Sequence, residues 1–170
     1  AVQRLDEPKG KETQIVGVHN GSLDNWKHKH NGKVFEVDSE WALSRIADIG
    51  DDAFKEIEGP YAFVWGDTAK KHVLSMCRNL GRPMHVVFSK DRKSVYFASE
   101  AGMLAWLCER NDIEVENEIL ALEAGQIYEF DSTGATVVVR SRKAPAVVPT
   151  NNISTFFKKD KEEPVKQKDT

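Results

Sequence analysis

The chain has 170 residues and a formal net charge of −3 at pH 7, with 24 Lys and Arg against 27 Asp and Glu. Hydrophobic residues make up 40% and charged residues 30%, which predicts one globular domain. A slightly acidic chain is not built to bind nucleic acid by bulk charge, and no apolar run approaches the roughly 20 residues that span a bilayer. Two cysteines are too few for a disulfide framework. Composition therefore predicts a cytoplasmic protein.

Strand patterns open the sequence. Residues 14–19 are β-rich and end at Asn20-Gly21, a strong turn signal. A polar stretch over residues 26–30 ends at a second Asn-Gly, at positions 31–32, and residues 34–37 predict another short strand.

A helix is expected from Asp38 or Ser39, either of which can cap it, to Gly50, which closes it. Residues 53–57 predict a second short helix. The side chains at helical spacing in the first helix are Trp41, Ala42, Arg45, Ile46 and Ile49. Of these, Ala42, Ile46 and Ile49 are expected to face a sheet.

The second half of the sequence is dominated by strands. They are predicted at residues 61–65, 72–77, 84–88, 94–98, 126–130 and 136–139. One helix interrupts them near residues 101–108, and its Leu104, Ala105 and Cys108 should also face a sheet. Because helices and strands segregate along the chain, the fold class is α+β, with antiparallel sheets covered by helices.

The periodicity stops after residue 141. Residues 158–170 are charged and almost without apolar side chains, so they cannot offset the entropy of ordering. The expected organisation is one domain over residues 1–145 and an extended or disordered tail over residues 146–170.

His19-Asn20-Gly21 supports two interpretations. The first is an ordinary hairpin turn. The second is an oxyanion hole, in which the Asn20 amide and the Gly21 backbone N–H point at one developing negative charge. Likewise, Asp38-Ser39-Glu40 is either a helix cap or the place where a carboxylate binds a substrate ammonium group.

Other patterns favour structural roles. His28 and His30 form an H-x-H pair, but lysines lie between them and no ligand set follows at a zinc-like spacing. Cys77 and Cys108 lie within a predicted strand and on a predicted helix face, where small core residues are expected. No phosphate- or dinucleotide-binding motif is present. We therefore expect neither a metal nor a cofactor.

Six short motifs, taken in order, resemble the class II glutamine amidotransferase domain of the N-terminal-nucleophile (Ntn) hydrolases. They are H-N-G at 19–21 with Asn25, D-S-E at 38–40, E-G-P-Y-A-F-V-W-G-D at 58–67, N-L-G-R-P-M at 79–84, F-A-S-E at 97–100 and L-E-A-G-Q-I-Y at 122–128. Each motif is weak alone, whereas six in the order and spacing of the family are fairly specific. The resemblance covers roughly residues 16–130.

The resemblance implies an αββα sandwich that hydrolyses glutamine and passes ammonia to an acceptor. Asn20 and Gly21 match the oxyanion hole of the family, and Asp38 matches a carboxylate that holds the α-ammonium of glutamine. Gly59, Arg82, Pro83 and residues 97–100 match positions that are mainly architectural.

The sequence departs from the family at its start. The family requires Cys as its first residue, followed by an opening strand and an R-x-A-T-x-G segment, whereas this sequence begins with Ala1. The expectation is an incomplete Ntn fold, with N-terminal strands missing, that does not hydrolyse glutamine as given.

Two hypotheses follow from this departure. The first is an amidotransferase whose N-terminal part lies outside these residues and that binds glutamine when its site is complete. The second is a non-enzymatic descendant of the fold that serves binding or assembly, for example as a structural or accessory protein of a phage. Under both hypotheses, an N-terminal segment or a protein partner is expected to cover the exposed sheet edge.

Overall fold

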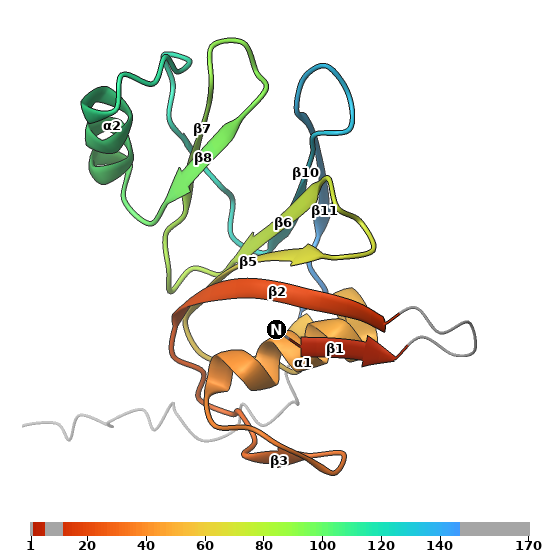
Figure 1. Cartoon of the computed structure of the whole chain (residues 1–170). Coiled ribbons are helices and arrows are strands. Elements are labelled where there is room, and N and C mark those ends of the chain that lie inside the picture. The colour runs from red at the N-terminus through yellow and green to blue at the C-terminus, as the bar shows by residue number, and fades with distance from the viewer. Residues whose placement is uncertain (1, 6–11, 147–170) are drawn as a thin grey trace, which may run out of the picture.

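Two antiparallel sheets stack in this computed structural model, which describes residues 2–5 and 12–146 (Figure 1). The larger sheet has six strands in the order β1-β2-β5-β6-β10-β11. Its strands are β1 (Val2–Leu5), β2 (Glu12–Gly21), β5 (Tyr61–Asp67), β6 (Val73–Arg78), β10 (Gln126–Asp131) and β11 (Val138–Lys143).

The smaller sheet has three strands in the order β8-β7-β9, and a separate two-stranded hairpin joins β3 and β4. These strands are β7 (His85–Phe88), β8 (Val95–Ala98), β9 (Leu120–Ala121), β3 (Lys29–His30) and β4 (Lys33–Val34). The helices are α1 (Asp38–Ile49), the 3₁₀ helix η1 (Gly50–Lys55) and α2 (Ala101–Arg110).

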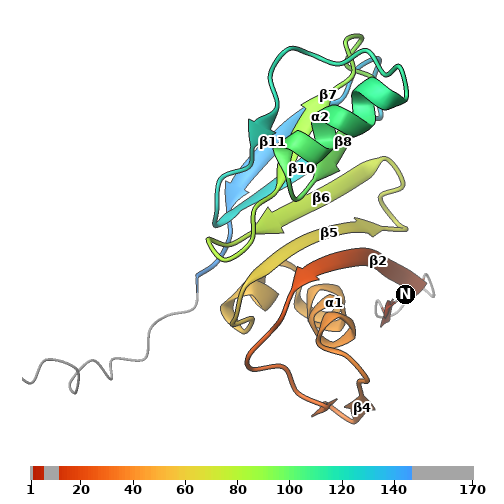
Figure 2. The same cartoon turned by 90° about the vertical axis from the view of Figure 1, so that its left-hand side faces the viewer.

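Three buried clusters define four layers. In the first cluster, α1 and η1 pack on one face of the larger sheet, around Trp41, Phe54 and Phe63. The second cluster lies between the two sheets, and the third joins α2 to the smaller sheet through Val87, Leu104 and Cys108. Figures 1 and 2 show α1 and α2 at opposite ends of the molecule, with the sheets between them. The arrangement is the expected αββα sandwich.

Strand β5 illustrates why an unbroken apolar run forms a strand here. Residues 61–65 are all buried, because Phe63 faces the α1 layer while Val64 faces the smaller sheet. A strand covered on both faces loses the alternation of apolar and polar residues that marks a half-exposed strand.

The predicted inward face of α1 is correct for two of its three residues. Ala42 and Ile46 are buried, whereas Ile49 is 37% exposed. Ile49 ends the helix, and the chain changes direction at Gly50, whose φ of 61° suits glycine. The last residue of the helix therefore does not lie over the sheet.

The predicted inward face of α2 is also narrower than expected. Leu104 and Cys108 are buried, but Ala105 is exposed. The prediction for Ala105 was wrong because α2 covers only the small three-stranded sheet. A single row of side chains, Leu104 and Cys108, is enough to make this contact.

Several predicted boundaries were also wrong. The helix expected at 53–57 is η1, which begins at Gly50, and the strand expected at 34–37 is β4, which ends at Val34. Strand β1 was not expected, because four residues carry little signal without their partner β2.

Residues 147–170 of the expected tail lie outside the described residues. Within the described part, no helix is long and apolar enough to cross a membrane.

Candidate functional site

The first Asn-Gly dipeptide is not a turn. Asn20 and Gly21 are the last residues of β2, and they still pair with Ala62 and Tyr61 of β5. Alternation along β2 turns Asn20 to the face opposite His19. The Asn20 side chain is exposed there. The hairpin interpretation of these residues was therefore wrong.

Gly21 lies against the chain that enters β5. A Cβ at this position would lie 2.0 Å from the Pro60 carbonyl oxygen and 2.7 Å from His19 Nε2. Its φ of 153° is also a conformation that other residues rarely adopt. The close approach of two backbones at the end of β2 therefore requires glycine.

The segment before β5 continues the pairing beyond Gly21. The Ser22 N–H donates to the Pro60 carbonyl at 3.1 Å, and the Asp24 N–H donates to the Glu58 carbonyl at 3.0 Å. Gly59, with φ 104°, allows this approach, since a Cβ there would lie 2.5 Å from the Ser22 oxygen. The E-G-P motif thus holds the loop that follows the Asn-Gly pair.

Asp38 lies beside this loop, although it does not cap α1 as expected. The N-cap residue is Val37, and no side chain caps the helix. The Leu23 N–H instead donates to Asp38 Oδ2 at 2.9 Å. The Asp38 side chain remains 22% exposed, so the carboxylate is held two residues beyond Gly21 and is still open to solvent.

His19 connects β2 to the start of α1, which motif reasoning did not anticipate. Its Nδ1 lies 3.0 Å from Ser39 Oγ, and Ser39 Oγ lies 3.2 Å from Asp38 Oδ1. The His19 side chain is 1% exposed and stacks on Phe63, with ring centroids 4.4 Å apart. The signals in the sequence are a histidine beside the Asn-Gly pair and a serine beside Asp38.

Burial lowers the pKa of His19 below its usual 6.5. The charge of Asp38 opposes this shift, whereas the charge of Arg82 adds to it. The imidazole is therefore neutral at pH 7.

The N-L-G-R-P loop holds the segment 59–61, which lies against Gly21. Asn79 Oδ1 accepts hydrogen bonds from the Tyr61 and Gly81 N–H groups, both at 3.0 Å, and Asn79 Nδ2 donates to the Gly59 carbonyl at 2.6 Å. Four of the motifs singled out in the sequence therefore meet around the end of β2.

Neither cysteine belongs to this group. Cys77 is fully buried in the α1 layer, and Cys108 is buried beneath α2. Burial raises the pKa of the Cys77 thiol to about 12, which leaves little thiolate near neutral pH. Both residues therefore serve the core, as the sequence predicted.

We expect the Cys77 thiol of a Cys108→Ser variant to react with Ellman's reagent at pH 8 at least ~10²-fold more slowly in the folded protein than in urea, since only the thiolate reacts. Release of thionitrobenzoate measures the rate. Equal rates in the two states would contradict the assignment of Cys77 to the core.

No group of three or more His, Cys, Asp or Glu in the described ranges could hold a metal ion. The H-x-H pair falls at the polar hairpin, with His30 in β3 and His28 just before it. The next strand adds Lys33 to the lysines already present.

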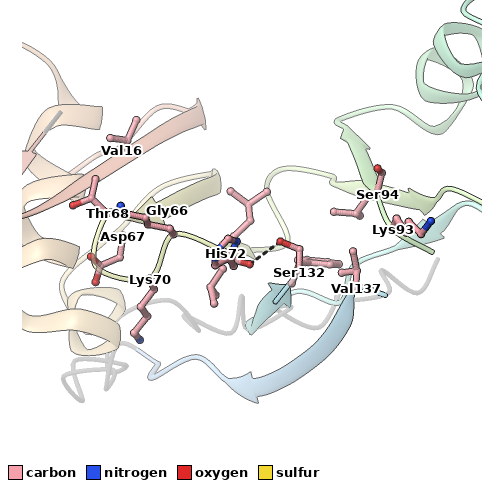
Figure 3. Close-up of a pocket in the computed structure, with 15 residues that line it drawn as sticks. Val16, Gly66, Asp67, Thr68, Lys70, His72, Lys93, Ser94, Ser132 and Val137 are labelled. Carbon is pink, nitrogen blue, oxygen red and sulfur yellow. Dashed lines mark hydrogen bonds between the residues drawn. The ribbon is translucent and has the colours of Figure 1, made fainter. Parts of the chain in front are cut away.

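A cavity of about 630 Å³ lies between the sheets, away from this group of residues (Figure 3). Val16 of β2 and Ser94, just before β8, lie on opposite sides of it, and Lys70 and Lys93 are among the residues that line it. Val16 pairs with Gly66, whereas Asn20 pairs with Ala62. The cavity is therefore toward the other end of the sheet from Asn20.

Comparisons with solved structures show the fold. The chain is similar to a structure described as the allosteric regulatory enzyme of purine biosynthesis, with 15% identity and a TM-score of 0.60 over 85% of this chain. It is also similar to glutamine phosphoribosylpyrophosphate amidotransferase from B. subtilis, with 16% identity and a TM-score of 0.56 over 84% of this chain. The chain spans 30% of the length of each.

A comparison with curated proteins finds no match. The sequence model of the family described as "Glutamine amidotransferase domain", however, matches residues 6–105, more than half of the 170 residues. The matched range includes Asn20, Gly21 and Asp38. This match confirms the resemblance inferred from the motifs, and the chain belongs to the glutamine amidotransferase domain family.

Proposed function

We propose that these 170 residues carry the oxyanion-binding and α-ammonium-binding parts of a glutamine site, and that a cysteine thiolate from outside them completes it. The reaction would be hydrolysis of the glutamine side-chain amide, through an acyl-enzyme, to glutamate and ammonia. The observation that carries the proposal is the hydrogen bond from the Leu23 N–H to Asp38, which holds a carboxylate beside the Asn20-Gly21 pair.

Each group has a distinct role. The Asn20 amide and the Gly21 N–H would stabilise the oxyanion that forms when the thiolate attacks the amide carbon. Each Asp38 oxygen accepts one hydrogen bond, Oδ2 from Leu23 and Oδ1 from Ser39, and the exposed part of the carboxylate keeps acceptor capacity to pair with the α-ammonium of glutamine. The site would thus recognise both ends of the substrate.

The open space between the sheets supports the proposal that an extended segment, rather than a single side chain, completes the site. Val16 and Val18 lie on the face of β2 that turns toward the smaller sheet, and they are 53% and 61% exposed. Val64, on the same face of the neighbouring strand β5, is buried. At β2, the larger sheet therefore extends beyond the part that the smaller sheet covers.

Strand β8 offers the complementary edge. Within the described part of the chain it pairs only with β7, so its other backbone edge is free to accept a strand. Val95 of β8 and Val16 of β2 both line the cavity. We propose that an extended segment with alternating apolar side chains lies over β2, and that it brings the cysteine to Asn20.

The test compares the 170-residue chain with the native protein, whose intact mass and first residue are determined. With 10 mM glutamine, the chain alone should release no glutamate above background, measured by a glutamate dehydrogenase assay. A native form that begins with Cys should release it steadily. Hydrolysis by the chain alone that survives Cys77→Ser and Cys108→Ser together would contradict the proposal.

The second candidate is a non-enzymatic protein that uses the same fold for binding or assembly. The burial of both cysteines favours it, as does the uncovered face of β2, which a partner strand would fill. A native protein that lacks the N-terminal Cys and forms a stable complex through β2 would support this function over hydrolysis.

A further inference from the structure

The His19 side chain is buried beside the proposed site, and the roles above do not use it. It lies one residue before Asn20 on β2, yet its side chain points to the opposite face, toward the start of α1. The stack on Phe63 fixes the plane of its ring.

The hydrogen bonds determine which nitrogen carries the proton. Asp38 as a carboxylate can only accept, so the Ser39 hydroxyl donates to Asp38 Oδ1. Ser39 Oγ must then accept from His19, which places the proton on Nδ1. His19 Nε2 is left as a bare acceptor, buried and without a partner in the described structure, against Gly21.

We propose that His19 is a positioning residue that holds the Asp38 carboxylate through Ser39 at a fixed place relative to the Asn20-Gly21 pair. The relay from His19 to Ser39 holds Oδ1, while Leu23 holds Oδ2 from the other side. Two oxygens held from two directions leave the carboxylate little freedom to rotate. The role assigned to the relay in substrate binding rests on the proposed glutamine site.

The environment of the ring makes the relay sensitive to pH. Protonation would place a donor on Nε2, where it faces Gly21 and lacks an acceptor. Asp38 on α1 favours the charged ring, whereas burial and Arg82, in the loop after β6, oppose it. The pKa is therefore lowered on folding, and the unfolded chain binds the proton first as the pH falls below 6.5. The stability that depends on neutral His19 is present above 6.5 and is lost as the pH falls through the lower folded pKa.

Two substitutions separate the hydrogen bond from the packing. His19→Phe keeps a ring on Phe63 but removes the Nδ1 donor. His19→Asn loses the ring, but its amide nitrogen can take the place of Nδ1. Ser39→Ala breaks the relay without altering His19.

The reporter is the Leu23 amide, whose hydrogen bond to Asp38 makes its NMR shift and exchange rate sensitive to the carboxylate. In the 170-residue chain we expect its exchange to accelerate roughly 10-fold in His19→Phe and Ser39→Ala, and to stay within about threefold of wild type in His19→Asn. In wild type its shift should titrate together with the His19 ring, with a midpoint below 6.5, and this titration should vanish in Ser39→Ala. Normal Leu23 exchange in both His19→Phe and Ser39→Ala would overturn the proposal, as would rescue by Phe rather than Asn.

Glutamine titration is a separate arm of the same experiment. The dissociation constant should rise about 10-fold in His19→Phe and Ser39→Ala and far less in His19→Asn. If wild type binds no glutamine while the Leu23 results hold, the proposed glutamine site fails and the positioning role of His19 stands. If glutamine binds equally to all variants, the role of the relay in substrate binding is wrong.

Discussion

Asn20→Ala is expected to lower the rate of glutamine hydrolysis about 10²–10³-fold in a form of the protein that carries the nucleophile. The reason is that the Asn20 amide would be one of two donors to the oxyanion, and a donor fixed in place stabilises the transition state more than the ground state. The fold should not change, because Asn20 is exposed at the end of β2 and its backbone pairing with Ala62 remains. The loss should therefore appear in kcat, measured as glutamate released per enzyme, with the melting temperature unchanged.

Asn117→Ala is the matched control for this prediction. Asn117 is also exposed, but it lies in the loop before β9, remote in sequence from the candidate residues. Its replacement should leave the rate within about twofold of wild type, as expected for a surface change. A loss of less than threefold for Asn20→Ala would assign the oxyanion donor to another residue.

Gly21→Ala should destabilise the 170-residue chain by about 2–3 kcal/mol, as expected for overpacking against a rigid neighbour. The added methyl would lie 2.0 Å from the Pro60 carbonyl oxygen, which is backbone and cannot rotate away. The positive φ of 153° adds strain. Relief requires the ends of β2 and β5 to separate, which also moves the Gly21 N–H. Equilibrium urea unfolding measures the loss.

Gly102→Ala provides the comparison. Nothing lies within 4 Å of a Cβ at Gly102, and the residue is exposed in α2. Because alanine favours the helix by up to about 1 kcal/mol over glycine, this variant should be as stable as wild type or more stable. If Gly21→Ala were equally harmless, the end of β2 would have to be looser than the structure shows.

The two Asn-Gly dipeptides show where sequence reasoning stops. Asn31 and Gly32 form the turn between β3 and β4, with φ values of 49° and 77°, as a two-residue hairpin requires. Asn20 and Gly21 are the same two residues, yet they extend a strand. The difference comes from Pro60 and Tyr61, which pair with the chain from about 40 residues away, and no local pattern records them.

The cap interpretation of Asp38 was wrong for a similar reason. A carboxylate at a helix start satisfies the local rule for a cap, so the sequence supported a hydrogen bond to its own helix as one of two interpretations. In the fold, the Leu23 N–H instead donates a hydrogen bond to Asp38 Oδ2 at 2.9 Å. The resemblance to the family had assigned Asp38 a binding role, and only the tertiary contact shows how the side chain is held.

By itself the sequence determined the α+β fold class, the approximate positions of most helices and strands, and the order of the site motifs, because apolar periodicity and turn residues act over a few neighbouring positions. Only the tertiary structure decided that His19 reaches Ser39, that both cysteines lie in separate cores, and that β2 extends beyond the smaller sheet. The first depends on the contact between β2 and α1, and the other two on how the helices and the two sheets pack. Such long-range contacts form only when all the layers pack together, so they leave no periodic signal in the chain.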